Sequence, residues 1–239
     1  MNFEEFGLKM LAAFHPPTYV HSNMVAKLAL CLADHLIDES PELFAGIRGC
    51  NNAEEVSRGR NKILDYVYHA ALCHDFGKLL IIDTVFVYGR KLLDVEMPII
   101  RSHALMGAKI LKRNDSTREY ADVAEGHHLW YDGSAGYPQT FDKEKSVYHA
   151  VIDVVACADC MDAATDVVGR SYNKGKTLEE YVSEVKAGSG TRYAPYLAKL
   201  LEKPQVKEEL EYLLDEGRKS VYEETYKLLR MLQTEDVRA

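Results

Sequence analysis

HSNMVAKLALCLADHL, residues 21–36, is the stretch that decides the fold class of this chain. Its apolar side chains recur every three or four residues, at Met24, Val25, Leu28, Cys31, Leu32 and Leu36. This spacing places them on one face of an amphipathic helix. Pro16 and Pro17 stop any earlier helix and prepare this one, because proline is tolerated in a first helical turn but not in a helix interior.

The sequence on the C-terminal side continues the helical pattern. Further helices are predicted over about 53–73, from Asp94 to about 112, from Ser116 to 125, over about 145–168, near 204–214 and near 217–234. The helix over 145–168 is apolar almost all round and is therefore expected to be central and buried. Ile81–Val87 has the β-propensity of a short strand. A helix or loop is favoured there, because no partner strand is evident.

These patterns predict an all-α fold. With no internal repeat and no linker, we expect one domain over residues 1–239, with a core at about 15–200 and a C-terminal helical extension over 201–239. A loop is expected over Asp132–Phe141, and a turn at Gly188–Gly190.

Charge and cysteine content limit the functional class. Lys and Arg number 29 against 37 Asp and Glu, a net charge of −8, which argues against nucleic-acid and anionic-membrane binding. No apolar run approaches the roughly 18 residues needed to span a bilayer. The five cysteines have no disulfide-framework spacing, and the N-terminal residues lack the features of a secretory signal. We therefore expect a cytoplasmic protein.

Histidine and aspartate placement is the most informative feature. Five of the nine histidines and two aspartates fall in, or at the ends of, separate predicted helices: His21, His74, Asp75, His103, His127, His128 and Asp159. Nitrogen and carboxylate ligands without thiolate suit Fe, Mn, Ni, Co or Zn. This set would satisfy two divalent transition-metal ions.

Four stretches around these residues resemble one known family. They are HDFGK at 74–78, HALMGAKIL at 103–111, HHLWYDGSAGYP at 127–138 and DCMDAATDVVGRSYNK at 159–174. In this order they are similar to the HD-GYP branch of the HD-domain metal-dependent phosphohydrolases, over roughly residues 15–200. The resemblance implies an HD-domain helical bundle that hydrolyses cyclic di-GMP or a related cyclic dinucleotide.

The resemblance also implies a role for each metal ligand. It carries His21, His74, Asp75 and Asp159 onto one metal, and Asp75, His103, His127 and His128 onto the other. Asp75 would bridge the two ions. Lys78 would act beside them, pairing with phosphate or orienting the nucleophile.

Four further residues are candidates for substrate binding. Arg170 would form a bidentate fork on phosphate or guanine, with Lys174 as a weaker candidate. Asp162 would accept from a guanine edge. Tyr137 belongs to the Gly-Tyr-Pro loop, which would shape the pocket or face a partner such as a diguanylate-cyclase protein.

The sequence departs from the HD-GYP pattern at several positions. Leu129 stands where the family usually has Glu, and one residue is inserted between Asp132-Gly133 and the Gly-Tyr-Pro triplet. Two residues are inserted between Asp159 and Arg170. Pro17 occupies the place of a Glu found in three-metal members, which favours two metals.

Other notable residues have ordinary structural interpretations. His15, His35, His69 and His149 are expected to be core or surface residues, and Cys157 and Cys160 to be small packing residues. Trp130 and Tyr131 could equally stack on a base or fill the core.

Three functions remain open at this stage. The first is a cyclic-dinucleotide phosphodiesterase. The second is an HD-type phosphohydrolase for another nucleotide or phosphomonoester, which the altered loop and Leu129 keep open. The third is a non-catalytic sensor or scaffold that binds a cyclic dinucleotide, motivated by the shifted Arg170 segment.

Overall fold

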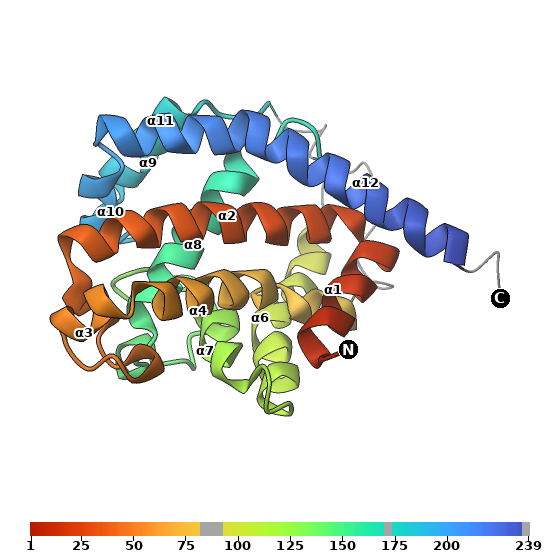
Figure 1. The fold of residues 1–239 in the computed structure, drawn as a ribbon, viewed down its shortest axis with the longest axis horizontal. Coiled ribbons are helices and arrows are strands. Elements are labelled where there is room, and N and C mark those ends of the chain that lie inside the picture. The colour runs from red at the N-terminus through yellow and green to blue at the C-terminus, as the bar shows by residue number, and fades with distance from the viewer. Residues whose placement is uncertain (82–92, 170–173, 236–239) are drawn as a thin grey trace.

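The computed structural model describes residues 1–81, 93–169 and 174–235, and this part of the chain is a bundle of helices (Figure 1). Its extended backbone pairing is limited to two isolated bridges among the described residues. The predicted all-α class is therefore confirmed. The helices are α1 (Phe3–Phe14), α2 (Pro16–Glu39), α3 (Ala53–Arg58), α4 (Arg60–Cys73), α6 (Met97–Lys112), α7 (Ala121–Gly126), α8 (His149–Thr165), α9 (Leu178–Ala187), α10 (Pro195–Leu200), α11 (Pro204–Tyr212) and α12 (Arg218–Glu235).

Helix α2 forms the centre of the bundle. It lies between α4 on one side and α11 and α12 on the other (Figure 1). It begins at Pro16, five residues before the periodic stretch, because prolines fit the first turn where their missing N–H costs nothing. His15 caps this turn by accepting from the Thr18 amide at 3.2 Å. His15 is therefore a structural residue.

Helix α8 is the second central element. It is shorter than the predicted 145–168, but it is buried on nearly all sides as expected. Small residues let it pack closely against α2, α7 and α9. Cys157 is one of these residues, and its carbonyl accepts a 2.7 Å hydrogen bond from the Tyr181 hydroxyl.

Several predicted boundaries change in the structure. The expected helix over 53–73 is two helices, α3 and α4, divided at Gly59. The helices expected from Asp94 and Ser116 begin with short 3₁₀ turns, Asp94–Glu96 and Arg118–Tyr120, before α6 and α7. Of the possible strand over 81–87, all but Ile81 lies outside the described residues.

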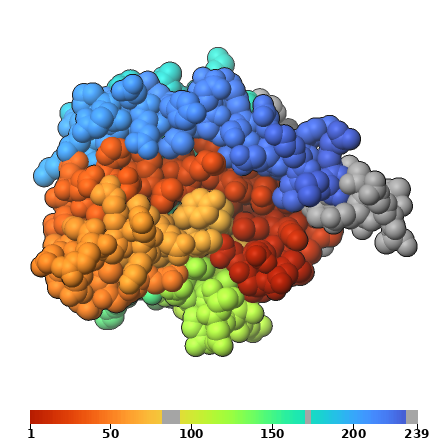
Figure 2. All heavy atoms as spheres, in the orientation of Figure 1, coloured from red at the N-terminus to blue at the C-terminus, as the bar shows by residue number. Residues whose placement is uncertain are grey.

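The C-terminal helices lie along α2. Figure 2 shows α11 and α12 as a blue band against the orange and red of α2. Leu210 of α11 belongs to the same cluster of buried apolar residues as the rest of the bundle, and Val221 of α12 packs with Val20 and Met24 of α2. The bundle core therefore continues past residue 200 into α11. Within the described chain, no helix combines the length and apolarity that crossing a membrane would require.

Candidate metal centre

The ends and faces of five helices bring the seven predicted metal ligands together. His21 comes from α2, His74 and Asp75 from the end of α4, His103 from α6, His127 and His128 from the end of α7, and Asp159 from α8. Asp75 lies at their centre. Its Oδ2 is 3.4 Å from His74 Nε2 and 3.7 Å from His21 Nε2, and its Oδ1 is 3.3 Å from His103 Nε2.

Three of the histidines are oriented by the backbone of their own helix. Nδ1 lies 2.6 Å from the Ala71 carbonyl in His74, 2.5 Å from the Ile100 carbonyl in His103 and 2.9 Å from the Ala124 carbonyl in His127. A carbonyl can only accept, so each Nδ1 carries the hydrogen. The lone pair of each ring is therefore on Nε2, which faces the centre.

This orientation leaves acceptors facing acceptors. His103 Nε2 and His127 Nε2 are 3.3 Å apart. Burial is the largest cause that lowers the pKa of each ring, to about 4, so both rings are neutral at pH 7. Two neutral nitrogen lone pairs at this separation cannot hydrogen-bond to one another, but they can share a cation.

Two further buried atoms in the same place have no partner. His74 Nε2 and Asp75 Oδ1 are both buried and make no hydrogen bond. Buried polar atoms left in this way cost free energy, so they are rare in folded proteins. Together with the facing nitrogens, they form the nitrogen and oxygen donor set that divalent transition metals prefer. The residues present therefore fit metal ions.

Lys78 is placed against the central carboxylate. Its Nζ lies 2.5 Å from Asp75 Oδ2, and its side chain is largely buried. Burial raises the pKa of Asp75, but Lys78 and the nearby imidazoles outweigh it and hold that pKa well below its usual range. Asp75 is therefore ionised and available as a ligand.

Gly77 explains how this turn reaches α6. A Cβ at Gly77 would lie 1.8 Å from the His103 carbonyl oxygen and 2.6 Å from the Gly107 amide nitrogen. Only glycine permits this approach. The glycine of the HDFGK stretch thus brings Asp75 and Lys78 to His103.

His21 is supported differently, by a chain of side chains. Its Nδ1 is 2.7 Å from Asp162 Oδ2, and its Nε2 is 3.0 Å from Asp159 Oδ1. Burial lowers the pKa of His21, but hydrogen bonds to Asp159 and Asp162 outweigh it and raise the pKa to about 9. His21 is therefore held between two carboxylates.

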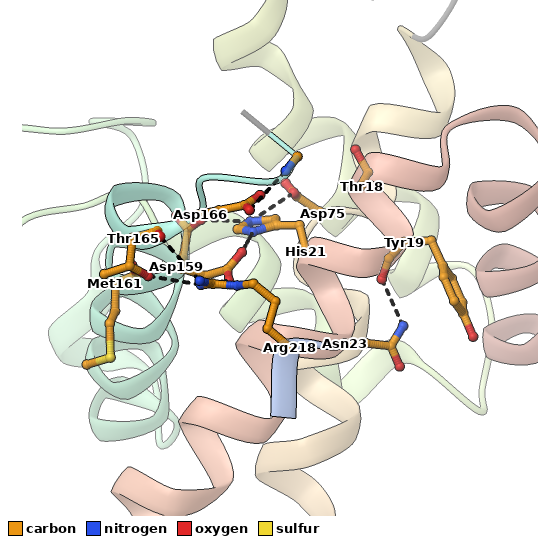
Figure 3. A network of polar contacts seen from close by, with 12 residues as sticks. Thr18, Tyr19, His21, Asn23, Asp75, Asp159, Met161, Thr165, Asp166 and Arg218 are labelled. Atoms are coloured by element: carbon orange, nitrogen blue, oxygen red, sulfur yellow. Dashed lines mark hydrogen bonds and ion pairs between the residues drawn. The ribbon is translucent and has the colours of Figure 1, made fainter. Parts of the chain in front are cut away.

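Arg218, the first residue of α12, completes this chain. Its Nη2 donates to Asp162 Oδ1 at 2.8 Å and to Thr165 Oγ1 at 2.9 Å. Figure 3 shows Arg218 reaching into the network that contains Thr165 and His21. The sequence prediction missed Arg218 because the C-terminal segment has the charge pattern of a solvated helical face. Arg218 is also far in sequence from the stretches that carry the predicted metal ligands, so no local pattern indicated its role.

Asp162 is placed behind His21 and not in a substrate pocket. It is buried, and both oxygens are engaged, one by His21 and one by Arg218. Both Asp162 oxygens thus have partners within the protein, and the predicted guanine contact stays a prediction. Lys174 is exposed, and Arg170 lies outside the described residues, so the structure gives no account of its predicted phosphate contact.

Tyr137 lies over the histidines. Its ring centroid is 4.6 Å from that of His128 and 6.2 Å from that of His103. Gly136 makes this possible, because a Cβ there would lie 2.1 Å from the His128 carbonyl oxygen and its φ is +90°. The Gly-Tyr-Pro loop thus folds directly onto the predicted metal ligands.

The remaining candidates have local partners. His69 Nδ1 contacts Glu4 at 2.5 Å, His35 contacts Glu209 at 2.9 Å, and His149 Nδ1 contacts the Ser146 carbonyl at 3.1 Å. Of the two aromatic residues, Tyr131 packs beneath Lys143 and against Tyr196, whereas Trp130 lines a cavity beside the histidines.

Comparison with known proteins agrees with this geometry. The chain is 34% identical over 145 residues to a cyclic di-GMP phosphodiesterase of Thermotoga maritima, which covers 60% of this chain and 38% of that protein. It is 34% identical over 128 residues to the cyclic di-GMP phosphodiesterase response regulator RpfG of Xanthomonas campestris, covering 53% of this chain and 32% of the relative. A 3'3'-cGAMP-specific phosphodiesterase 2 of Vibrio cholerae is 32% identical over 139 residues, covering 57% and 26%.

The matched part of the chain thus covers less than two fifths of the length of each relative, namely 38%, 32% and 26%. The HD domain family matches residues 18–164, a range that includes all seven predicted ligands from His21 to Asp159. HD domains bind divalent metals, in keeping with the donor set described above. The chain belongs to the HD domain family.

Proposed function

We propose that this chain is a metal-dependent phosphodiesterase of the HD-GYP type, which hydrolyses cyclic di-GMP or a related cyclic dinucleotide. The observation that carries the proposal is the set of unpartnered acceptors around Asp75, with the His103 and His127 Nε2 atoms 3.3 Å apart. The substrate class follows the names of the relatives, three of which act on cyclic di-GMP or cGAMP by name.

Two divalent transition-metal ions would be held by the seven side chains. His21, His74, Asp75 and Asp159 would hold one ion, and Asp75, His103, His127 and His128 the other. When bound, such a pair supplies a hydroxide at neutral pH and neutralises charge that grows on phosphate oxygens. Asp75 fits the bridging position because its two oxygens face different histidines.

Lys78 would lie beside the ions. Its ammonium group contacts Asp75, at the centre of the side chains that would hold them. It is placed to hold a non-bridging phosphate oxygen or to orient the attacking water. Water adds to phosphorus and the ribose oxygen leaves with a proton, so one phosphodiester bond opens and a linear dinucleotide forms. A second cleavage would give mononucleotides.

Leu129 favours a second candidate, a phosphohydrolase for another nucleotide or a phosphomonoester. The side chain is 6% exposed and stands where the HD-GYP family usually has Glu, so that carboxylate is missing beside His128. A third candidate, a cyclic-dinucleotide sensor without turnover, is an outcome of the test below. We also propose diguanylate-cyclase proteins as partners of the Gly-Tyr-Pro loop. Because all five cysteines are free thiols, we propose a cytoplasmic location.

The test combines metal analysis with turnover. The protein is purified without chelator, Fe, Mn, Ni, Co and Zn are counted per chain, and cyclic di-GMP, cyclic GMP-AMP and p-nitrophenyl phosphate are supplied as substrates. About two metals per chain with a linear dinucleotide product is the expected result. Hydrolysis of the phosphomonoester alone would favour the second candidate, and tight dinucleotide binding without product the third. No metal after reconstitution with Mn or Fe would overturn the proposal.

A further inference from the structure

A cavity of about 400 Å³ opens beside the metal centre. His127 and His128 form one part of its wall, Trp130 and Tyr137 a second, and the segment 192–194 a third. This volume falls within the range of small-molecule sites in proteins. A group in the cavity would therefore lie next to a phosphate held at the predicted metal ligands.

The charged residues in this wall give the cavity a net positive charge. They are Arg101, Arg192 and Asp153. Asp153 is already neutralised, because Lys143 Nζ lies 2.6 Å from Oδ1 and the Tyr196 hydroxyl donates to Oδ2 at 2.8 Å. The two guanidinium groups remain, in a chain whose net charge is −8. The cavity is therefore suited to an anion.

Arg101 lines the cavity beside Tyr137. Its guanidinium carbon is 5.8 Å from the centroid of the Tyr137 ring, which itself lies over His128 and His103. Within the described ranges of the chain, no carboxylate lies within ion-pair distance of Arg101. An exposed guanidinium in this position can take a phosphate oxygen.

Arg192, also in the cavity wall, is held in a fixed orientation. Its Nη1 is 2.9 Å from Glu184 Oε1, its Nη2 is 3.3 Å from Cys160 Sγ, and its guanidinium carbon is 5.0 Å from the Tyr193 ring centroid. Glu184 also pairs with Lys176, so one carboxylate serves two cations. A guanidinium has five N–H donors, and these two contacts leave the others for a ligand.

The backbone joins the Arg192 segment to the loop that carries Trp130. The Tyr131 amide donates to the Arg192 carbonyl at 3.2 Å, and the Asp132 amide donates to the Thr191 carbonyl at 3.0 Å. The aromatic ring of Trp130 and the fork of Arg192 are therefore set on two connected backbones. A preorganised pair of this kind is what recognition of a flat, polar ring requires.

We propose, on the basis of the proposed function, that this cavity binds the nucleotide half of the substrate that is not being cleaved, and that Arg192 selects guanine. Guanine presents two acceptors, O6 and N7, which match the guanidinium fork, whereas adenine presents an amino donor beside N7. Trp130 supplies a stacking surface for the base. Arg101 binds the phosphate of the same nucleotide.

The test is calorimetric titration with 5′-GMP and 5′-AMP, which needs no turnover. Wild-type protein is expected to bind GMP more tightly than AMP. Arg192→Gln and Arg192→Lys should weaken GMP binding by roughly 5- to 100-fold and leave AMP nearly unchanged, because both lose the bidentate contact. Arg101→Gln should weaken both nucleotides equally. Trp130 is the one tryptophan in the sequence, so its emission gives a second readout.

Arg58→Gln is the matched control, since Arg58 is exposed on α3 and pairs only with nearby Glu54 among the described residues. Equal affinity of the wild type for GMP and AMP would overturn the proposal. An unchanged GMP preference in Arg192→Lys would also overturn it. This variant keeps the positive charge, so it serves if Arg192→Gln fails to fold. Guanine preference without any hydrolysis would reject the phosphodiesterase but retain this site. Turnover of cyclic di-GMP with an unaltered KM in both Arg192 variants would reject the site but retain the enzyme.

Discussion

The two sides of the predicted metal centre position their histidines by different means. His74, His103 and His127 each use the carbonyl three residues earlier in their own helix. His21 instead uses Asp162, which is 141 residues away in sequence, and Asp162 in turn uses Arg218, a further 56 residues along. Support from the backbone cannot be removed by changing one side chain. Support from side chains can, so we expect the His21 side to be the more sensitive to substitution beyond the ligands themselves.

The largest effect is expected where both sides meet, at Asp75. Asp75→Ala removes the carboxylate that faces His74 and His103 with separate oxygens. The proposed phosphodiesterase activity should fall by on the order of a thousandfold or more, with loss of bound metal. Steady-state turnover and metal content measure this. Asp142→Ala, an exposed carboxylate paired with Lys145, is the control, and full metal content with near-normal turnover in Asp75→Ala would refute the bridging role.

Asp162→Ala tests the side-chain support directly. His21 loses the acceptor 2.7 Å from its Nδ1, so its ring is free to rotate and its basicity drops. Metal affinity should fall by roughly 10- to 100-fold, as for other residues that hold a metal-binding histidine. Competition with a chelating dye gives the affinity. If the affinity of this variant matches that of the wild type, the asymmetry between the two sides does not exist.

Arg218→Met should have a smaller effect of the same kind. Asp162 keeps its bond to His21 but loses the guanidinium, so metal affinity should fall by about 3- to 10-fold. Because Arg218 acts through Asp162, the double variant should bind metal as weakly as Asp162→Ala alone. A double-mutant cycle on metal affinity measures this, and simple addition of the two losses would show that Arg218 acts by another route.

Ile100→Ala examines the backbone-supported side. The carbonyl that accepts from His103 Nδ1 remains when the side chain is shortened. Metal affinity should change by less than about twofold, since only side-chain packing is altered. The same chelator competition applies. A loss as large as that of Asp162→Ala would mean that backbone support gives no protection.

The smallest effect concerns a histidine away from the centre. His69 has its pKa raised, first by its hydrogen bond to Glu4, against the opposing effect of burial. A raised folded pKa means that the pair stabilises the fold fully below the unfolded pKa of about 6.5, and that this stabilisation is lost as pH rises through the folded value. The contribution should be under about 1 kcal/mol, because the pair is partly exposed and screened. Urea unfolding across that pH range measures it, and Glu4→Gln should flatten the dependence.

Local sequence signals predicted most of the fold. The three- and four-residue spacing over 21–36 predicted α2, and the apolar composition after residue 145 predicted a buried α8, because both depend on periodicity within one segment. Glycine at position 59 was too weak a signal to divide α3 from α4. The apolar spacing also did not predict the helix Phe3–Phe14, whose start depends on the capping box between Asn2 and Glu5.

The candidate site was predictable to the same extent. Six of the seven proposed ligands lie in the four short stretches that resemble the HD-GYP family, and His21 begins the periodic stretch 21–36. The structure brings all seven together. The contact between Asp162 and Arg218 was not predicted, because the two residues are 56 positions apart and no local pattern indicates it. Arg192 lies in a turn after α9, where only the folded chain shows that it faces the same cavity as Trp130.

Arg218 also bears on where the working unit of this protein ends. The family match stops at residue 164, yet the guanidinium that braces Asp162 belongs to a helix beyond it. A chain shortened to the matched range would keep all seven ligands and lose one of their supports. The residues that match the family therefore end before the residues that support the predicted metal ligands.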